Sequence, residues 1–269
     1  MYLYRFFPLF ILLYIPLTTN ANENTCPRII SQSPYISHML DYLGLAECIV
    51  GVSRYSKRSL PHTGGILDPD AQAIDSLMPD LFITSDWTSQ ATLKKVLAGD
   101  VKAIRLKSFN SMLQLEENMQ LILDATGHTQ VSNKVEAFAK SWREKVKQVD
   151  GNNRQVLLLS SCSGMPYSFG PNSRLYDLFT KAGFRVVETG EKIRHIRPGN
   201  EIEGLNHLLN RYRPDLLFVF EQTLNKQCQL LLPEKPVRIL NLDGSKFLHP
   251  STSILEGLDL LIANKHVWH

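Results

Sequence analysis

The sequence contains no block of basic residues and no strong excess of charge of either sign. Its 29 Lys and Arg residues nearly balance 26 Asp and Glu residues, which leaves a formal net charge of +3 on 269 residues. Proteins that bind nucleic acid concentrate basic side chains on one face or in one segment. The even distribution of charge here predicts that nucleic acid is not a partner.

Motifs of nucleotide binding and of nucleophilic catalysis are also missing. The sequence has neither a Gly-x-Gly-x-x-Gly fingerprint nor a Walker A motif. Residues 160–164, SSCSG, carry hydroxyl and thiol groups but lack the Gly-x-Ser-x-Gly elbow of hydrolases. The histidines have no tight spacing that would predict a metal site. We therefore expect a protein that is not an enzyme and has no resident metal or cofactor.

Cysteine is scarce, and its four positions form no Cys-x-x-Cys motif of the zinc or redox type. In an exported protein, four cysteines allow three pairings. Cys26 and Cys48 each come just before a predicted strand, with one helix between them. The starts of neighbouring parallel strands lie close together, so a Cys26–Cys48 disulfide is the expected pairing. Cys162 and Cys228 are expected either to pair or to remain free.

Long apolar runs are absent except near the N-terminus, where residues 6–17 are apolar but too short for a comfortable membrane span. One positive charge precedes this run, and the small residues of Thr19-Asn20-Ala21 follow it. This order is typical of a cleaved secretory signal. We expect residues 1–21 to be a signal peptide and the mature chain to be periplasmic. An uncleaved membrane anchor is the alternative.

What the sequence does contain is an alternation of short apolar runs and helical patterns on both sides of a helical connector. Apolar residues recur at helical spacing over 109–149, and Thr126-Gly127 interrupts them, so a break is expected there. Alternating strands and helices predict parallel sheets with covered faces. We expect an N-terminal α/β lobe at 22–107, a helical connector at 108–153 and a C-terminal α/β lobe at 154–269.

The individual elements follow from the same patterns. Strands are expected at 28–31, 48–52, 80–84, 101–104, 155–160, 185–187, 215–220 and 237–242, and helices at 35–43, 69–77, 88–98, 173–182, 201–212, 224–232 and 251–264. Residues 161–172 are expected to form a loop. The phrases Leu77-Met78-Pro79-Asp80-Leu81 and Tyr212-Arg213-Pro214-Asp215-Leu216 repeat one pattern, which favours two related lobes over one continuous sheet.

Three further phrases, PRIISQSP at 27–34, IVGVSRYS at 49–56 and GGILDPD at 64–70, occur in a specific order with the first Pro-Asp phrase. In this order the sequence resembles the periplasmic substrate-binding proteins of ABC importers whose lobes are joined by a helical backbone, the vitamin B12 and ferric-siderophore receptor family. The Tyr55-Ser56 and Gly64-Gly65 loops are most similar to the cobalamin-binding branch. The resemblance implies two Rossmann-like lobes with parallel sheets.

The resemblance also implies an inner-membrane ABC permease as partner, which members of the family meet through one exposed glutamate on each lobe. Gln72 and His207 occupy these positions here. A neutral amide cannot form a charge-assisted pair with a permease arginine, and a protonated His would repel it. Neighbouring acids could take over this role, the protein could serve a different permease, or it could bind its ligand without docking.

In parallel α/β lobes, ligands meet the loops at the carboxyl ends of the strands. The candidate ligand-binding residues in these loops are Ser33, Pro34, Tyr35, Arg54, Tyr55, Gly65, Ile66, Leu67, Trp87, Tyr167, Phe169, Arg194, His195, Glu221 and Asp243. The aromatic members would bury a large flat ligand, and the arginines could grip a carboxylate or phosphate. Tyr35 could instead pack in the core, Phe169 could anchor a turn, and the arginines could form surface ion pairs.

Together these features predict a monomeric periplasmic protein that captures a large metal chelate between its lobes and delivers it to a permease. Cobalamin or another corrinoid is the expected ligand, and a ferric siderophore or heme is the alternative within the same class. A protein that kept the fold but lost transport would explain Gln72 and His207 equally well.

Overall fold

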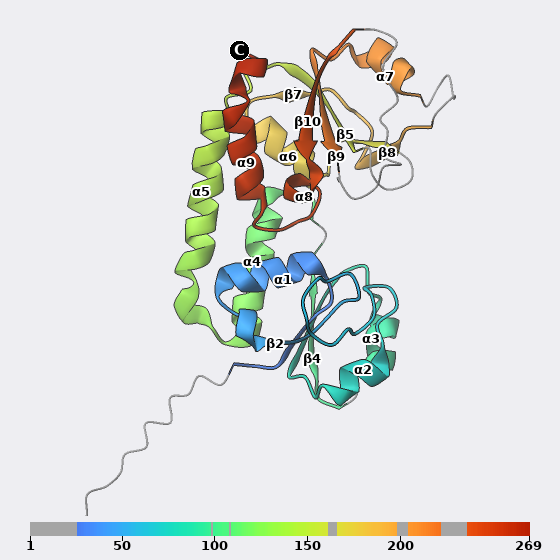
Figure 1. Ribbon diagram of the computed structural model, residues 1–269, viewed down its shortest axis with the longest axis vertical. Helices are drawn as coiled ribbons and strands as arrows, with labels where there is room; N and C mark the ends of the chain where they lie inside the picture. The colour runs from blue at the N-terminus through green and yellow to red at the C-terminus, as the bar shows by residue number, and fades with distance from the viewer. Residues whose placement is uncertain (1–25, 98, 108, 161–165, 198–203, 222–235) are drawn as a thin grey trace, which may run out of the picture.

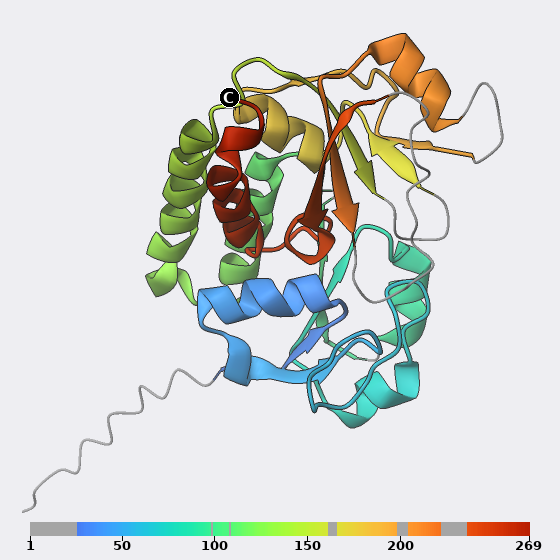
Figure 2. The same cartoon turned by 45° about the horizontal axis from the view of Figure 1, so that its top comes forward.

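The computed structural model describes residues 26–97, 99–107, 109–160, 166–197, 204–221 and 236–269. Two α/β lobes lie one above the other, and a pair of antiparallel helices runs along one side of both (Figures 1 and 2). The expected signal peptide, Cys162, Cys228 and the helix expected at 224–232 lie outside the described residues. Within the described ranges, no helix is long and apolar enough to cross a membrane.

The first lobe holds a sheet of four parallel strands in the order β2-β1-β3-β4. Its strands are β1 (Ile29–Ser31), β2 (Ile49–Val52), β3 (Leu81–Ser85) and β4 (Lys102–Leu106), and its helices are α1 (Pro34–Leu43), η1 (Ala46–Cys48), α2 (Ala71–Ser76) and α3 (Gln90–Val96). Strands β1 and β3 are buried along their whole length, as expected for parallel strands covered on both faces. The helices on either face supply this cover.

The second lobe repeats this strand order and adds two strands to it. Strands β5 (Gln155–Ser160), β7 (Arg185–Val186), β9 (Leu216–Glu221) and β10 (Arg238–Asp243) are parallel in the order β7-β5-β9-β10. Strand β6 (Tyr167–Phe169) pairs antiparallel with the C-terminal end of β5, and strand β8 (Ile193–His195) pairs antiparallel with β6. The helices of this lobe are α6 (Arg174–Lys181), α7 (Leu205–Tyr212), α8 (Gly244–Phe247), α9 (Ile254–Ala263) and η3 (Lys265–Val267).

These sheets confirm the predicted α/β fold class, with one correction. The sheet of the second lobe is mixed rather than purely parallel, because residues expected to form a loop at 161–172 include strand β6. Its three residues hydrogen-bond to β5 and β8, which lie elsewhere in the sequence. A strand this short, beside Pro166 and Gly170, forms through tertiary pairing and carries little pattern of its own.

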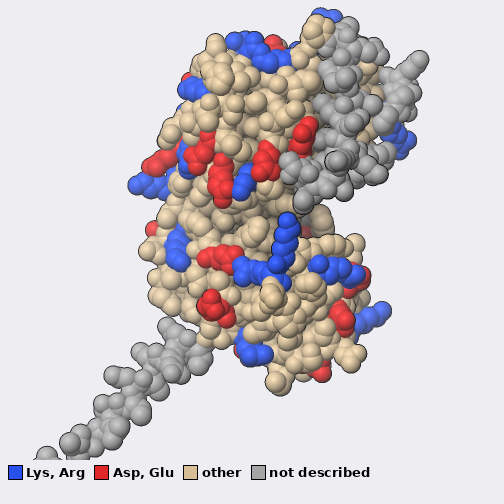
Figure 3. Space-filling view, viewed as in Figure 1, with Lys and Arg blue, Asp and Glu red and all other residues tan. Residues whose placement is uncertain are grey.

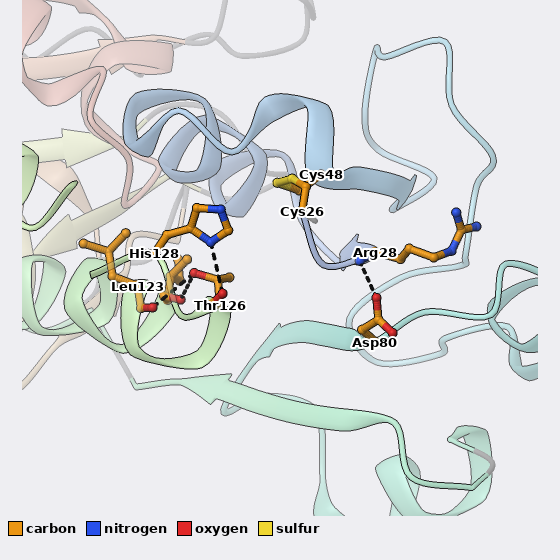
Figure 4. The surroundings of a disulfide bond; sticks show 8 residues. Cys26, Arg28, Cys48, Asp80, Leu123, Thr126 and His128 are labelled. Carbon is orange, nitrogen blue, oxygen red and sulfur yellow. Dashed lines mark hydrogen bonds between the residues drawn. A yellow bond between two sulfur atoms is a disulfide. The ribbon is translucent and has the colours of Figure 1, made fainter. Parts of the chain in front are cut away.

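The aspartates of the two Pro-Asp phrases form equivalent hydrogen bonds in the two lobes. Oδ2 of Asp80 accepts from the backbone N–H of Arg28 at 2.7 Å, just before β1 (Figure 4). Oδ2 of Asp215 accepts from the backbone N–H of Gln155 at 2.9 Å, at the start of β5. In each lobe the aspartate N–H also donates back to the carbonyl of that residue, at 3.0 and 2.8 Å. Each aspartate therefore clamps the first strand of its lobe to the strand that it precedes.

The helical connector breaks at the expected position and then reverses direction, which the sequence pattern did not predict. Helix α4 (Met112–Thr126) ends at Gly127, whose φ of 74° stops the helix. After the short helix η2 (Thr129–Val131), helix α5 (Asn133–Val149) runs back beside α4 (Figure 1). The indole N–H of Trp142 on α5 donates to Oε1 of Glu116 on α4 at 2.6 Å and ties the two helices together.

One hydrophobic core runs from the first lobe through α4 and α5 into the second. It includes Ile29 and Leu81 of the first lobe, Leu115 and Phe138 of the helix pair, and Phe218 of the second lobe. Helix α5 contacts both lobes, because Phe138 meets the ring of Tyr42 on α1 and Lys145 forms an ion pair with Asp259 on α9. The two lobes are therefore held together by packing against the same helix pair rather than by a single flexible linker.

The predicted disulfide is present. Cys26, just before β1, is bonded to Cys48 at the end of η1, with Cα atoms 5.3 Å apart (Figure 4). The bond fixes the segment that enters β1 against the segment that enters the neighbouring strand β2, as expected for adjacent parallel strands.

Candidate functional site

A cavity of about 610 Å³ lies between the lobes. The first lobe contributes the N-terminus of α1, the loops after β2 and β3, and Phe109 before α4. The second lobe contributes β6, the N-terminus of α6, the start of β8 and the segment after α8. The site is therefore built at the junction of the two lobes from the ends of their strands and helices, as expected for this architecture.

Aromatic side chains from both lobes form much of the wall. On the first lobe, the ring of Tyr35 contacts that of Phe109 edge to face, with centroids 5.2 Å apart. On the second lobe, Tyr167 contacts Phe169 at 5.1 Å. Edge-to-face contacts of this kind hold rings in fixed orientations. Tyr55 and Trp87 also line the cavity, and 69% and 68% of their surfaces are exposed, so a ligand can reach both rings. The guanidinium of Arg54 lies over the Tyr55 ring, 5.9 Å from its centroid.

The loops of the first lobe are held in place by buried polar groups. The side chain of Gln32, which is fully buried, donates to the carbonyls of Thr63 and Gly65 at 2.8 and 3.0 Å. The hydroxyl of Thr88 donates to the carbonyl of Ile66 at 2.7 Å. Burial raises the pKa of Tyr35 to about 12, so its hydroxyl is protonated at neutral pH. These contacts present a fixed wall that carries no charge at Tyr35.

Glu188 organises the corresponding wall of the second lobe. Its carboxylate is fully buried and accepts from Nε and Nη2 of Arg194 at 3.0–3.1 Å, from the hydroxyls of Ser168 and Tyr212, and from the N–H of Gly190. Burial alone would raise the pKa of Glu188, but these hydrogen bonds together lower it. The cluster joins β6, β8 and α7, and it fixes the segment that brings Lys192 and Ile193 to the cavity.

Arg174 lines the cavity from the first turn of α6 and is 95% buried, since its exposed fraction is 5%. Its Nη2 donates to the carbonyl of His249 at 3.1 Å and to that of Phe247. Its Nη1 is buried and has no hydrogen-bond partner among the described residues. Burial lowers the pKa of Arg174 to about 10, so the guanidinium remains charged at neutral pH.

The structure brings together eight of the expected ligand-binding residues around this cavity. They are Ser33, Pro34, Tyr35, Tyr55, Ile66, Trp87, Tyr167 and Phe169. Their contact with a ligand remains a prediction; the structure shows that these residues, from loops of both lobes, lie around one cavity.

The other seven expected residues do not line the cavity. Arg54 forms an ion pair with Asp68 at 2.5 Å, and Arg194 is bound to Glu188. Gly65 is buried beneath the side chains of Arg54 and Tyr55, and Leu67 is 72% exposed beyond them. The remaining three, His195, Glu221 and Asp243, stand at the ends of β8, β9 and β10.

Sequence reasoning did not select several residues that line the cavity. They are Ser85, Phe109, Ser173, Arg174, Leu175, Lys192, Ile193, Leu248, His249 and Pro250. Asp86, which the sequence pattern placed with Trp87 in the loop after β3, also lines the cavity. Arg174 has no sequence signal, because within the sequence it is an ordinary first-turn residue of an amphipathic helix.

The described residues contain no group of three or more His, Cys, Asp or Glu side chains that could hold a metal ion. The positions expected to face a permease lie on surface helices. Gln72 is exposed on α2, and His207 is partly exposed on α7. On the face viewed in Figure 3, basic and acidic side chains are interspersed among the described residues.

No family model and no curated protein matches the sequence, but solved structures match the fold. A periplasmic heme-binding protein of Roseiflexus sp. RS-1 aligns with a TM-score of 0.69 and 20% identity over 90% of this chain and 99% of its own. The periplasmic vitamin B12 binding protein of Vibrio cholerae aligns with a TM-score of 0.68 and 13% identity over 90% and 97%. An ABC transporter substrate-binding protein of Listeria monocytogenes aligns with a TM-score of 0.65 and 18% identity over 88% and 97%.

The first two of these neighbours bind different ligands, heme and vitamin B12, so the predicted place in the cobalamin-binding branch is not confirmed. The fold of all three matches over 88–90% of this chain. The protein has the two-lobed α/β fold of the class III periplasmic binding proteins.

Proposed function

We propose that the protein is an exported solute-binding protein that captures a large, flat metal chelate of the tetrapyrrole kind between its lobes. The observation that carries this proposal is the cavity of about 610 Å³ walled by aromatic rings from both lobes. Flat aromatic walls bury the faces of a conjugated macrocycle, while a few polar groups fix its edge. The protein acts by binding, and no catalytic step is assigned to it.

Two further observations support export and binding. The Cys26–Cys48 disulfide suits an oxidising compartment such as the periplasm. The solved structures of similar fold include periplasmic proteins that bind heme and vitamin B12. A corrinoid is the ligand expected from the sequence, and heme or a ferric siderophore is equally consistent with these neighbours.

The partner that would receive the ligand is an inner-membrane ABC permease. Gln72 and His207 would then face the permease at the positions where the family has glutamates. Asp75, exposed on α2, could supply a carboxylate to the permease from the first lobe. The second candidate function is a monomeric ligand-binding protein that does not dock to a permease. Neighbouring genes for a permease and an ATPase would favour transport over this alternative.

Binding is best measured by tryptophan fluorescence, because Trp87 lines the cavity while Trp142 and Trp268 are only 3% and 1% exposed. Purified protein is titrated with cobalamin, with iron(III) protoporphyrin IX and with a ferric hydroxamate siderophore. We expect saturable quenching and a raised melting temperature with one of the tetrapyrroles. Trp87→Phe, which keeps an aromatic ring, is expected to remove most of the quenching but to keep the thermal stabilisation. The absence of both signals with all three ligands would contradict the proposal.

A further inference from the structure

The four parallel strands of the second lobe all begin beside an arginine. Each of these arginines is the first residue of a strand or stands up to three residues before it; they are Arg185 (β7), Arg154 (β5), Arg213 (β9) and Arg238 (β10). Parallel strands begin at the same edge of a sheet, and neighbouring strands lie about 4.8 Å apart. The four arginines therefore span roughly 15 Å of the edge that faces away from the cleft, and we call them the basic edge.

The positive charge of the basic edge is not balanced by the acids beside it. Asp150 already forms an ion pair with Lys265 at 3.2 Å, and Oδ2 of Asp215 accepts the backbone N–H of Gln155. Within the described ranges, no ion pair joins a carboxylate to any of the four arginines. Figure 3 shows basic side chains gathered at the top of the second lobe, while most of its acidic side chains lie lower, toward the first lobe.

The guanidinium groups of the basic edge can be reached from outside. Three of the arginines are exposed, and Arg154 is partly exposed. The side chains of Arg185 and Arg213 form no hydrogen bond with the described part of the chain. Nε of Arg154 and Nη1 of Arg238 each donate to one backbone carbonyl of the segment that contains η3. A guanidinium has five N–H donors, so most donors of the four side chains remain for an external acceptor.

The first lobe has the same strand order but not the same charge at this edge. Its strand starts carry both signs, on Arg28, Glu47, Asp80, Asp100 and Lys102. Before the repeated Pro-Asp pair it has Met78, where the second lobe has Arg213. The fold therefore forms without a row of arginines, and packing alone does not account for the basic edge.

We propose that the basic edge binds the anionic headgroups of a phospholipid membrane surface. The inference goes beyond the proposed function and takes from it only the export of the protein, which places the chain in a compartment bounded by membranes. Guanidinium groups match phosphate oxygens in charge and in hydrogen-bond geometry. The aromatic side chains that are most exposed in the described chain, Tyr55 and Trp87, belong to the other lobe, so the contact is electrostatic and does not insert into the lipid.

This placement leaves the cleft free. The cavity is lined by residues at the carboxyl ends of the strands and at helix starts, whereas the basic edge is formed where the strands begin. A protein held at the basic edge would concentrate near the membrane and could still load its ligand. If the arginines only hold the segment that contains η3, membrane charge has no effect.

Vesicle sedimentation with full-length mature protein tests the proposal without a ligand in the cleft. Vesicles of phosphatidylcholine alone are compared with vesicles of equal parts phosphatidylcholine and phosphatidylglycerol. We expect the protein to sediment only with the anionic vesicles at low salt. It should be released at about 0.5 M salt, because screening weakens attraction between exposed charges.

Variants then locate the contact. One triple variant removes three exposed charges of the basic edge: Arg185→Gln, Arg213→Gln and Arg238→Gln. Each arginine near an anionic surface contributes about 5-fold to partitioning, so this variant should bind the vesicles about 100-fold more weakly. The matched control removes the same charge from exposed lysines of α3 and α5: Lys94→Gln, Lys95→Gln and Lys140→Gln. Its partitioning should stay within about 3-fold of the unmodified protein, because charges beyond the screening length contribute little.

The double variant Arg185→Gln/Arg213→Gln removes no hydrogen bond of the described chain, so it tests the proposal even if the triple variant does not fold. It should bind the vesicles about 25-fold more weakly. No binding to anionic vesicles, or an equal loss in the arginine and lysine variants, would overturn the proposal. Release by phosphate but not by chloride at equal ionic strength would assign the arginines to free oxyanions and would also overturn it.

These outcomes are independent of chelate binding. The arginine variants are expected to bind the tetrapyrrole as the unmodified protein does, since their changed residues lie outside the cleft. A protein that binds anionic vesicles through the basic edge but none of the chelates would count against the proposed function alone.

Discussion

At the scale of single residues, the second wall of the cleft depends on the buried carboxylate of Glu188. Replacing it by Gln keeps the shape but removes the charge that Arg194 and the hydroxyls of Ser168 and Tyr212 bind. We expect Glu188→Gln to lower the free energy of unfolding by about 2 kcal/mol, the usual range for hydrogen bonds to a charged group. Urea denaturation measures this change. Glu191→Gln, an exposed change in the same loop, is the control and is expected to have little effect.

The pH dependence of this effect has a defined sign. The pKa of Glu188 is lowered in the folded protein from its ordinary value of 4.5. Its contribution to stability is therefore fully present above pH 4.5 and is lost as the pH falls through the lowered value. The difference in stability between the unmodified protein and Glu188→Gln should shrink as the pH falls below about 4. A difference that grew in acid would contradict the assignment.

The exposed aromatic residues of the first lobe should matter for binding but not for folding. Tyr55 and Trp87 are 69% and 68% exposed at the cavity. Changing both to Ala should alter the free energy of unfolding by less than about 0.5 kcal/mol per site. The dissociation constant of the bound tetrapyrrole should rise by about 10-fold, because flat contact area is lost. Calorimetric titration measures binding and urea denaturation measures stability, and a large loss of stability would show that these rings are part of the fold.

The residue types in the sequence predicted the aromatic side chains that line the cavity but not the buried Arg174. Tyr55 and Trp87 follow strands in recognisable loops, so their place at the carboxyl edge of the sheet follows from the order of elements. The buried state of Arg174 depends on carbonyls at Phe247 and His249, more than 70 positions away. Similarly, Arg194 was expected to reach the ligand, but Glu188 binds it first. The contacts of Arg174 are too distant in sequence to leave a local pattern.

At the scale of elements, the disulfide joins the entries of two neighbouring strands across 22 residues of sequence. Closing a loop of this length is expected to stabilise the folded state by about 3 kcal/mol, mainly by restricting the unfolded chain. The variant with both Cys26 and Cys48 changed to Ser should lose about this amount in urea denaturation. Reduced protein serves as the matched comparison and should behave like the double variant; equal stability of oxidised and reduced protein would contradict the prediction.

Helices and parallel strands were predictable from periodicity, while pairing and chain direction were not. The expected break at Thr126-Gly127 is real, but periodicity does not say that α5 returns beside α4. That reversal is fixed by tertiary contacts such as the bond between Trp142 and Glu116. Strand β6 was expected to be loop for a similar reason, since its ladder partners lie in β5 and β8.

At the scale of the whole molecule, the shared core limits how far the lobes can move. Helix α5 contacts α1 of the first lobe through Phe138 and α9 of the second lobe through Lys145. Packed cores resist continuous deformation. We expect ligand binding to change the radius of gyration by less than about 1 Å in small-angle X-ray scattering, as for a largely pre-formed site. A contraction of several ångströms would indicate hinge closure instead.

Each lobe has four parallel strands, and their order is the same in both lobes. Each lobe also has an aspartate, Asp80 or Asp215, that binds the backbone of its first strand. Helix α1 follows the clamped strand β1 of the first lobe, and helix α6 follows β5 and the short strand β6 of the second lobe; each helix begins after a serine, Ser33 before α1 and Ser173 before α6. The next residue is proline in one copy and arginine in the other. The two lobes therefore face the cavity with different residues at corresponding helix starts, Pro34 and Arg174, so a ligand with two unlike edges is expected to be held in one orientation.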